Sequence, residues 1–193
     1  PNVPADIVTF DVANPTAIKQ LTNVNEDILA GKKLGAVKEM WYTSADGMKI
    51  QGWYVTPPDF DATKKYPMQL HIHGGPHSMY GVGFNFGWQE QAANGYVVLY
   101  TNPRGSTGYG SSFGNQINNA YPSKDYDDLM GGVDELLKKG FVDERNMCVT
   151  GCSGAGRSMS LPREAGSGWS TNRPVENRRS PTKKGRQRPP GSR

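Results

Sequence analysis

Alternating apolar and polar residues predict a β-hairpin in the first third of the chain. Two strand-like runs, residues 39–43 and 49–55, flank Asp46 and Gly47. An Asp-Gly pair between such runs is typical of the tight turn of a hairpin. An earlier strand-like run at residues 7–12 stands in a mostly polar stretch that shows no helical stripe.

Two strongly apolar runs follow, with a short helical segment between them. Residues 68–73 and 96–100 predict strands, and the second run is continuously apolar, as in a strand covered on both faces. Residues 88–94 predict a helix, which Gly95 ends as a C-terminal cap. A helix that connects two strands in this way indicates that the strands run parallel.

The clearest helix is predicted over residues 125–139, where apolar residues recur at helical spacing and Gly140 ends the pattern. Asp residues in its first turn and Lys residues in its last turn offset the helix dipole, so we interpret the Asp cluster as helix chemistry rather than as a metal site. A short strand at residues 147–150 follows. This order of strands and helices predicts an α/β fold with a mainly parallel sheet.

Charge and composition divide the chain into three expected parts. Residues 1–156 carry 12 Lys and Arg against 16 Asp and Glu, whereas residues 157–193 carry 10 against 2. The later segment is rich in Arg, Pro and Ser, and it has too few apolar residues to offset its ordering entropy. We therefore expect an N-terminal segment at residues 1–36, a folded domain over residues 37–156, and an irregular basic tail over residues 157–193.

Several classes of protein and site are not indicated. No apolar run is long enough to span a membrane and no signal peptide opens the chain, so a cytoplasmic location is expected, with the periplasm as the alternative. The cysteines and histidines lack zinc-site spacing, so neither a metal nor a cofactor is expected. Cys148 and Cys152 are predicted to be free thiols, because a strand would place them about 13 Å apart, beyond the ~7 Å reach of a disulfide. The basic tail has no recognition motif, so no specific nucleic-acid partner is expected.

The candidate nucleophile is Ser153, within the segment VTGCSGAG at residues 149–156. A serine on a tight turn between a strand and a helix exposes its hydroxyl, and the strained turn requires small neighbours. Gly151 and Gly154 meet this need, whereas Ala155 stands where a glycine is usual. Such a short pattern also occurs by chance in Gly- and Ser-rich sequence, and the strand and helix before it are what favour a serine hydrolase.

A glycine turn at residues 73–76 is the candidate oxyanion hole. It follows an apolar strand, and the backbone N–H groups of such a turn can stabilise a developing oxyanion. Gly75 is the best donor of this loop, and Gly154, after the nucleophile, would supply a second N–H. A plain Gly-Gly-Pro turn without catalytic purpose is the alternative.

All three histidines of the chain precede Ser153. A serine nucleophile needs a general base, and in α/β-hydrolases that base follows the serine. His71 and His73 alternate along a strand and share one face, where at least one is expected to be hydrogen-bonded in the core. His77 lies past the glycine turn. It is the candidate for a substitute base, with His73 or a group from a second chain as alternatives.

A Gly-rich loop, NPRGSTGYG at residues 102–110, follows the strand at residues 96–100. It is not a phosphate loop, because it lacks a Gly-Lys-Ser/Thr sequence and no helix begins directly after it. Arg104 stands where the end of a parallel strand can reach a ligand crevice. Equally, Arg104 can hold the loop together by hydrogen bonds to carbonyl groups, and the sequence alone leaves both interpretations open.

Four motifs in order resemble the catalytic domain of the prolyl oligopeptidase family of serine peptidases. They are HGGPHS at residues 73–78, NPRGSTGYG at 102–110, DYDDL at 125–129 and GCSG at 151–154. The nearest branch of the family is that of the dipeptidyl and acylaminoacyl peptidases. The resemblance covers residues 37–156, and residues 1–36 resemble the last strands of the β-propeller that precedes this domain in the family.

The resemblance implies the N-terminal part of an α/β-hydrolase fold, with cleavage of short peptides near their N-terminus and side activity on esters. It implies Ser153 as the nucleophile, with Gly75 and Gly154 lining the oxyanion hole. Some relatives carry at the position of His73 a tyrosine whose hydroxyl donates there, so His73 is expected to line the hole as well. For substrate binding, the resemblance of the motif at residues 102–110 implies Arg104 and Tyr109.

The chain departs from the family after the elbow. The Asp and His of the family lie well past the serine, and residues 154–193 contain neither. Pro162 would break the apolar helix that the family continues with. The change to Arg, Pro and Ser resembles translation in the wrong reading frame, a hypothesis that sequencing of the source DNA tests.

Two functions are consistent with these observations. The first is a truncated serine hydrolase with weak turnover of short peptides or small esters, because a serine without its base is a poor nucleophile. An oxyanion hole and binding alone still leave on the order of 10³-fold catalysis over water. The second is a non-catalytic fragment that forms a homo-oligomer through an exposed sheet edge. Neither function involves a membrane partner.

Overall fold

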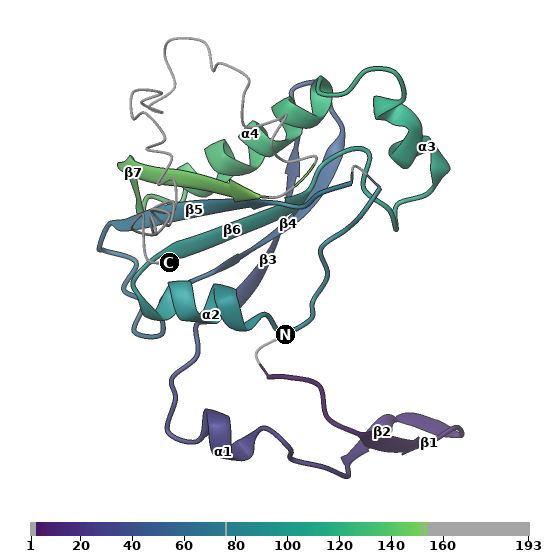
Figure 1. The fold of residues 1–193 in the computed structure, drawn as a ribbon, viewed down its shortest axis with the longest axis vertical. Helices are drawn as coiled ribbons and strands as arrows, with labels where there is room; N and C mark the ends of the chain where they lie inside the picture. The colour runs from purple at the N-terminus through teal and green to yellow at the C-terminus, as the bar shows by residue number, and fades with distance from the viewer. Residues whose placement is uncertain (1–2, 76, 152, 154–193) are drawn as a thin grey trace, which may run out of the picture.

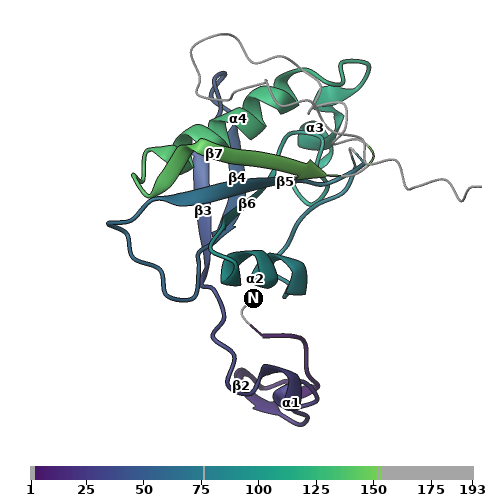
Figure 2. The same ribbon diagram turned by 60° about the vertical axis from the view of Figure 1, so that its left-hand side comes forward.

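The computed structural model describes residues 3–75, 77–151 and 153 of the 193-residue chain. It forms two separate sheets, as Figure 1 shows. The smaller sheet pairs β1 (Val8–Asp11) with β2 (Asn14–Gln20) and is followed by the short helix α1 (Glu26–Leu29). Every residue of both strands is exposed, and this hairpin lies apart from the larger sheet (Figures 1 and 2).

Five strands form the main sheet, in the order β3-β4-β6-β5-β7. Their bounds are β3 Val37–Thr43, β4 Lys49–Val55, β5 Tyr66–Ile72, β6 Val97–Asn102 and β7 Val142–Gly151. The β3–β4 and β4–β6 pairings are antiparallel, whereas β5 pairs in parallel with both β6 and β7. The α/β class is therefore confirmed, and the parallel half of this mixed sheet is the half that ends at the candidate nucleophile.

Helices cover both faces of the main sheet. Helix α2 (Phe86–Ala93) packs on one face and α4 (Lys124–Leu137) on the other (Figures 1 and 2). The short helix α3 (Ser111–Gly114) and the 3₁₀ turn η1 (Asn115–Ile117) lie in the connection between β6 and α4. Because helices cover both faces of the sheet, all six residues of β6 are buried. The continuous apolar run of this strand predicts such burial.

The core consists of two layers that the sheet separates. On the α4 face, Leu129 and Val133 pack with Leu70 of β5 and Leu99 of β6. On the α2 face half of the buried residues are aromatic, and the cluster consists of Trp53, Val55, Trp88, Ala92, Val98 and Tyr100. The two layers hold β5 and β6 in place, and the loops that follow these strands carry the candidate site.

Most of the predicted elements are confirmed, one strand differs in extent, and one strand has no predicted counterpart. The hairpin around Asp46 and Gly47 is β3–β4, and the two predicted helices are α2 and α4. Strand β7 begins at Val142, before the predicted start at residue 147, because Val142 already pairs with Tyr66 at the start of β5, and the register is irregular between that pair and Met68 with Met147. Strand β2 was not predicted, since its exposed residues alternate in no pattern that burial would impose.

None of the helices in the described part of the chain has the length and apolar character needed to cross a bilayer. Over the same residues, no group of three or more His, Cys, Asp or Glu side chains is arranged to hold a metal ion. Cys148 is a free thiol in β7, and burial raises its pKa. Its expected neighbour Cys152 lies outside the described residues.

Candidate active site

Ser153 stands two residues beyond the end of β7, at the edge of the sheet where the parallel strands end. Gly151, the last residue of β7, pairs with Ile72, the last residue of β5. Because the two strands run in the same direction, the segment that leads to Ser153 and the loop that begins at His73 leave the sheet side by side. The candidate nucleophile and the candidate oxyanion loop are therefore brought to one edge by the β5–β7 register.

The backbone of Ser153 has the conformation that a strained elbow requires. Its φ is 59°, in the left-handed region that residues other than glycine rarely adopt, and its side chain is exposed. Residues held in this region are often found at active sites, where surrounding structure compensates the strain. Gly154, the expected second oxyanion donor, lies outside the described residues, as does Ala155.

The loop after β5 contains a position that only glycine can occupy. Gly75 has a φ of 131°, and a Cβ there would lie 2.6 Å from the backbone N of His77. The residue is exposed, and within the described part of the chain its N–H has no hydrogen-bond acceptor. A free N–H on an exposed loop is what an oxyanion hole needs. Its assignment to that role remains a prediction.

His73 is half-buried, and both of its ring nitrogens are engaged. Nδ1 lies 2.9 Å from the carbonyl oxygen of Gly74, and Nε2 lies 3.0 Å from Oγ of Ser106. The ring of Tyr80 packs edge-on against the imidazole, with 5.1 Å between the ring centroids. Burial lowers the pKa of His73, against the opposing effect of its bond to Gly74.

His71 is a hydrogen-bonded core histidine. Trp88 Nε1 donates to its Nδ1 at 3.2 Å, which requires Nδ1 to be unprotonated, and Nε2–H then donates to Gln91 Oε1 at 3.0 Å. Burial lowers its pKa, so the ring remains neutral near neutral pH. His71 therefore has no free nitrogen for catalysis.

His77 is exposed, on the loop that begins at His73. The structure describes no hydrogen bond that would fix its ring toward Ser153. Its role as a substitute base remains a prediction, and it is supported chiefly by the fact that the nitrogens of His71 and His73 have other partners.

Arg104 is buried, and its side chain joins the hairpin turn to helix α4. Its Nη1 and Nη2 each donate to Asp46 at 2.7 Å, and Nε and Nη2 donate to Asp128 at 2.8 and 2.7 Å. A bond of 3.3 Å from Nη1 to Gln116 occupies the fifth N–H. The holding role left open by the sequence is thus present, with side-chain acceptors, chiefly carboxylates, in place of backbone carbonyls. A substrate contact by Arg104 would have to displace one of these bonds, and that role remains a prediction.

Tyr109 is also held within the protein. Its hydroxyl donates to Gln51 Oε1 and accepts from Asn102 Nδ2 at 2.7 Å. Asn102 further binds the backbone of Tyr80 in both directions, as acceptor at 2.8 Å and donor at 2.9 Å. The loop after β6 is thereby fastened to the loop after β5. Substrate binding by Tyr109 is untested by this geometry and remains a prediction.

An aromatic cluster supports the candidate site from the α2 side of the sheet, and sequence reasoning missed it. Tyr100 stacks on Trp88 at 3.9 Å and on Trp53 at 5.6 Å between ring centroids, and Tyr80 meets Tyr100 edge-on at 5.4 Å. Burial raises the pKa of Tyr80 to about 12. The only signal in the sequence was the density of aromatic residues, which does not reveal that strand, helix and loop bring these rings together.

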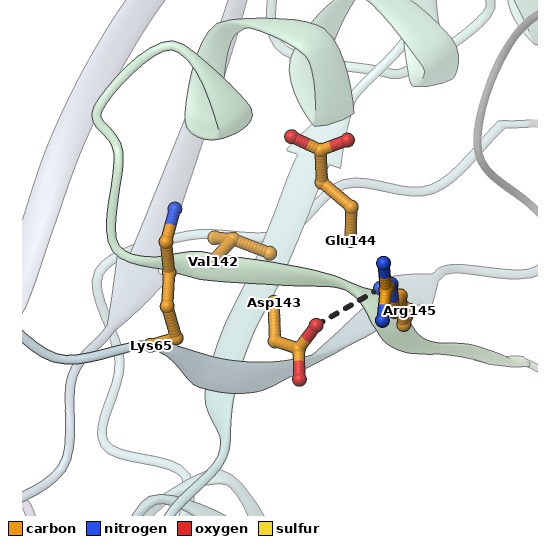
Figure 3. A pocket seen from close by; sticks show the side chains of 5 residues that line it. All are labelled: Lys65, Val142, Asp143, Glu144 and Arg145. Atoms are coloured by element: carbon orange, nitrogen blue, oxygen red, sulfur yellow. Dashed lines mark hydrogen bonds between the residues drawn. The ribbon is translucent and has the colours of Figure 1, made fainter.

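A pocket of about 410 Å³ lies at the other end of the same strands, away from Ser153. Figure 3 shows its lining residues, which come from the start of β7 and from Lys65, just before β5. Asp143 accepts hydrogen bonds from the backbone N of Arg145 and from Asn146, and these bonds lower its pKa. The carboxylate is thus already satisfied, and the pocket contains none of the predicted catalytic residues.

Comparisons with known proteins find relatives of this chain in one peptidase family. Residues 83–161 match the model of the prolyl oligopeptidase family. The chain is 38% identical over 157 residues to a protein of Bacillus subtilis named uncharacterized peptidase YuxL. This match covers 81% of the chain and 24% of that protein. It is 32% identical over 160 residues to dipeptidyl-peptidase 5 of Porphyromonas endodontalis, with 81% of the chain and 23% of that protein covered.

Solved structures show the same likeness. The acylaminoacyl peptidase of Pyrococcus horikoshii superposes with a TM-score of 0.73 at 30% identity, over 81% of this chain and 25% of that one. The chain thus spans about a quarter of the length of the relatives it matches. Together these matches confirm the family and the α/β-hydrolase fold that the four motifs indicated.

Proposed function

We propose, on the premise that this chain belongs to the prolyl oligopeptidase family, that it carries the nucleophile and oxyanion loop of a serine peptidase. Substrates would be short peptides cleaved near their N-terminus, in keeping with the dipeptidyl-peptidase and acylaminoacyl peptidase names of similar proteins. Small activated esters would be accepted as well, since they react through the same acyl-enzyme and need less assistance to their leaving group.

The chemistry would proceed through an acyl-enzyme on Ser153. Its Oγ attacks the substrate carbonyl carbon while a base takes the hydroxyl proton, and the carbonyl oxygen becomes an oxyanion. The C–N bond then breaks, and the leaving amine takes the proton from the base. Water attacks the ester in the same manner and restores the serine. The N–H of Gly75 is the described group best suited to stabilise the oxyanion.

The observation that carries the proposal is the left-handed backbone of Ser153 at the end of β7. A positive φ at a serine is uncommon, and here it coincides with the strand-to-helix elbow that the sequence motif predicts. The N–H of Gly75 on the adjacent loop has no acceptor among the described residues, which adds a second feature expected of an acyl-transfer site.

The general base is the weakest part of the site, and we expect weak turnover by this chain. Among the upstream histidines, His77 is the best candidate because it is exposed, whereas His73 has both nitrogens engaged. A substitute base that is not held in position contributes less than the 10²–10⁴-fold typical of general base catalysis, which is about 3–5 kcal/mol.

A fluorophosphonate probe tests the proposal directly, because it reacts only with an activated serine. Labelling of the wild type and loss of labelling in Ser153→Ala are expected. Ser112→Ala is a matched control, since Ser112 is an exposed serine at the start of α3. No labelling of the wild type, or equal labelling of Ser153→Ala, rejects the serine hydrolase function.

A second function is favoured by one observation, the exposure of β7. Within the described residues β7 pairs only with β5, and most of its residues are exposed or half-buried. An unpaired edge of ten residues is a template for pairing with a second copy, so a non-catalytic, self-associating fragment is the alternative. Sedimentation velocity distinguishes the serine hydrolase from the self-associating fragment. A monomer at micromolar concentration argues against the self-associating fragment, and an oligomer without probe labelling supports it.

A further inference from the structure

We propose that Ser106 and His73 are positioning residues that orient the Gly74–Gly75 peptide, so that the N–H of Gly75 faces the oxyanion rather than the protein interior. The inference deepens the proposed function and rests on it for its catalytic meaning. It assigns to Ser106, which neither the motifs nor the comparisons single out, a part in the site. It also replaces direct donation by His73 with an indirect role.

The first step is the proton on His73 Nδ1. A carbonyl oxygen can only accept, so the 2.9 Å contact with the oxygen of Gly74 requires a hydrogen on Nδ1. The described non-proline peptides are trans, and in a trans peptide the C=O and the following N–H point in opposite directions. By holding the carbonyl of Gly74, His73 turns the N–H of Gly75 away from its own ring.

The second step is the partner of the other nitrogen. With the proton on Nδ1, the neutral ring has a lone pair on Nε2, and Ser106 Oγ lies 3.0 Å from it. Ser106 is 1% exposed, and its own position is fixed by a turn in which its backbone N donates to Pro103 at 3.1 Å. When the single hydroxyl proton of Ser106 points to Nε2, this bond stabilises the Nδ1–H tautomer that the contact with Gly74 needs.

The hydroxyl of Ser106 has a competing acceptor, the carbonyl oxygen of Pro103 at 2.6 Å. When the hydroxyl of Ser106 donates to Pro103, Nε2 of His73 must carry the ring proton to keep a hydrogen bond with Ser106. Nδ1 of the neutral ring then has no proton, and its hydrogen bond to the carbonyl of Gly74 is lost. The tautomer of His73 therefore reports which arrangement is populated. Tyr80, packed edge-on at 5.1 Å, keeps the ring in the plane that both contacts require.

The need for such a device follows from the loop itself. Two consecutive glycines have little intrinsic preference for one peptide orientation, so the Gly74–Gly75 peptide can turn over at small cost. An oxyanion donor contributes most when it is oriented before the reaction begins. The contacts cross from the loop after β5 to the loop after β6, so the rigid ends of two neighbouring strands hold the orientation.

The tautomer is measured without any activity. Long-range ¹H–¹⁵N spectra of the full chain labelled at histidine give one signal pair for each of the three histidines, and His73 is assigned by its loss in His73→Asn. We expect the Nδ1–H tautomer for His73 at neutral pH, and a shift toward Nε2–H in Ser106→Ala. A predominant Nε2–H tautomer in the wild type overturns the proposal, whether or not Ser153 reacts.

The catalytic meaning is tested by the rate of fluorophosphonate inactivation. Ser106→Ala is expected to lower the maximal rate by about 10-fold to 100-fold with little change in the apparent affinity for the probe, less than the ~10²–10³ of losing a donor outright. His73→Phe should lower the maximal rate at least as much as Ser106→Ala does. His73→Asn, whose Nδ2 can donate near the position of Nδ1, should recover most of the rate, and Ser112→Ala should match the wild type.

The outcomes separate the two proposals. Equal rates in Ser106→Ala, His73→Phe and the wild type overturn the positioning role while the serine hydrolase function stands. An unreactive wild type with the expected tautomer rejects the function and leaves only the orientation of the peptide. Thermal unfolding of each variant shows whether that variant folds. If Ser106→Ala or His73→Phe does not fold, the inactivation rate of His73→Asn compared with that of the wild type decides whether the positioning role holds.

Discussion

Arg104 Nη2 and Asp128 Oδ1 lie 2.7 Å apart, and neither side chain reaches solvent. Arg104 lies in the loop two residues beyond the end of β6, and Asp128 lies in the first half of α4, so the pair joins this end of the sheet to the helix that covers it. Asp46, from the turn of the β3–β4 hairpin, approaches the other side of the guanidinium at 2.7 Å. One arginine thus fastens three segments around the loop that leads toward the candidate site.

Removal of the arginine is expected to destabilise the fold. Arg104→Met removes the guanidinium from the buried Asp128 carboxylate, which keeps only the hydrogen bond from the backbone N–H of residue 104, and breaking a buried ion pair in this way costs about 3–5 kcal/mol. Urea unfolding followed by circular dichroism measures the change. The double variant Arg104→Met with Asp128→Leu should recover part of the loss, because it leaves no unpaired charge. Lys33→Met, at the exposed pair with Asp59, serves as control and should not change the stability measurably.

The contribution of Asp46 should depend on acid pH. Its hydrogen bonds with Arg104, and secondarily with Lys124, hold the pKa of the Asp46 carboxyl well below its usual 3.8. A folded-state pKa below the unfolded value means stabilisation that is present above about pH 4 and is lost as the pH falls toward the folded pKa. The free energies of unfolding of the wild type and of Asp46→Asn should differ at neutral pH, and this difference should become smaller at acid pH. A difference independent of pH contradicts this account of the carboxyl.

The buried histidines should make the fold weaker as the pH drops below about 6.5. Burial lowers the pKa of His71 and His73 in the folded state, so the unfolded chain binds protons first and stability falls from the unfolded value of 6.5 downward. Histidine NMR titrations should place both rings below 6.5. His71→Gln should flatten the dependence of the unfolding midpoint on pH between about pH 5 and 7. An unchanged slope in that variant would show that His71 does not take up the proton.

The folded protein should be more stable with glycine than with alanine at position 153. At a φ of 59°, a residue with a Cβ costs about 1–2 kcal/mol that glycine avoids, although glycine adds entropy to the unfolded chain. Ser153→Gly should therefore unfold at higher denaturant than Ser153→Ala, by about 1 kcal/mol, while both lack the nucleophile and neither reacts with the probe. If the alanine variant is the more stable of the two, Ser153 does not adopt the left-handed conformation in solution.

Local signals in the sequence were sufficient for the hairpin and the helices. Asp46-Gly47 between two strand-like runs predicts β3–β4, and the helical spacing over residues 125–139 predicts α4, because turn residues and periodicity act over a few neighbours. Ser153 was singled out by a signal of the same local kind, since small residues must surround a strained turn, and its role as nucleophile remains a prediction. The motif order then identified the family and its fold.

The roles of individual side chains depended on partners far along the chain. Arg104 is 58 residues from Asp46 and 24 from Asp128, and His73 is 33 from Ser106. Spacing in sequence carries no information on such pairs, because the sheet order β3-β4-β6-β5-β7 and the packing of α4 decide which loops meet. Likewise the sequence alone indicated a glycine turn after β5 and a turn of small residues around Ser153. Only the tertiary structure decided that parallel β5 and β7 bring these two turns to one edge, and that His73 lies within hydrogen-bond distance of the Gly74 carbonyl, because both depend on contacts between segments far apart in the sequence.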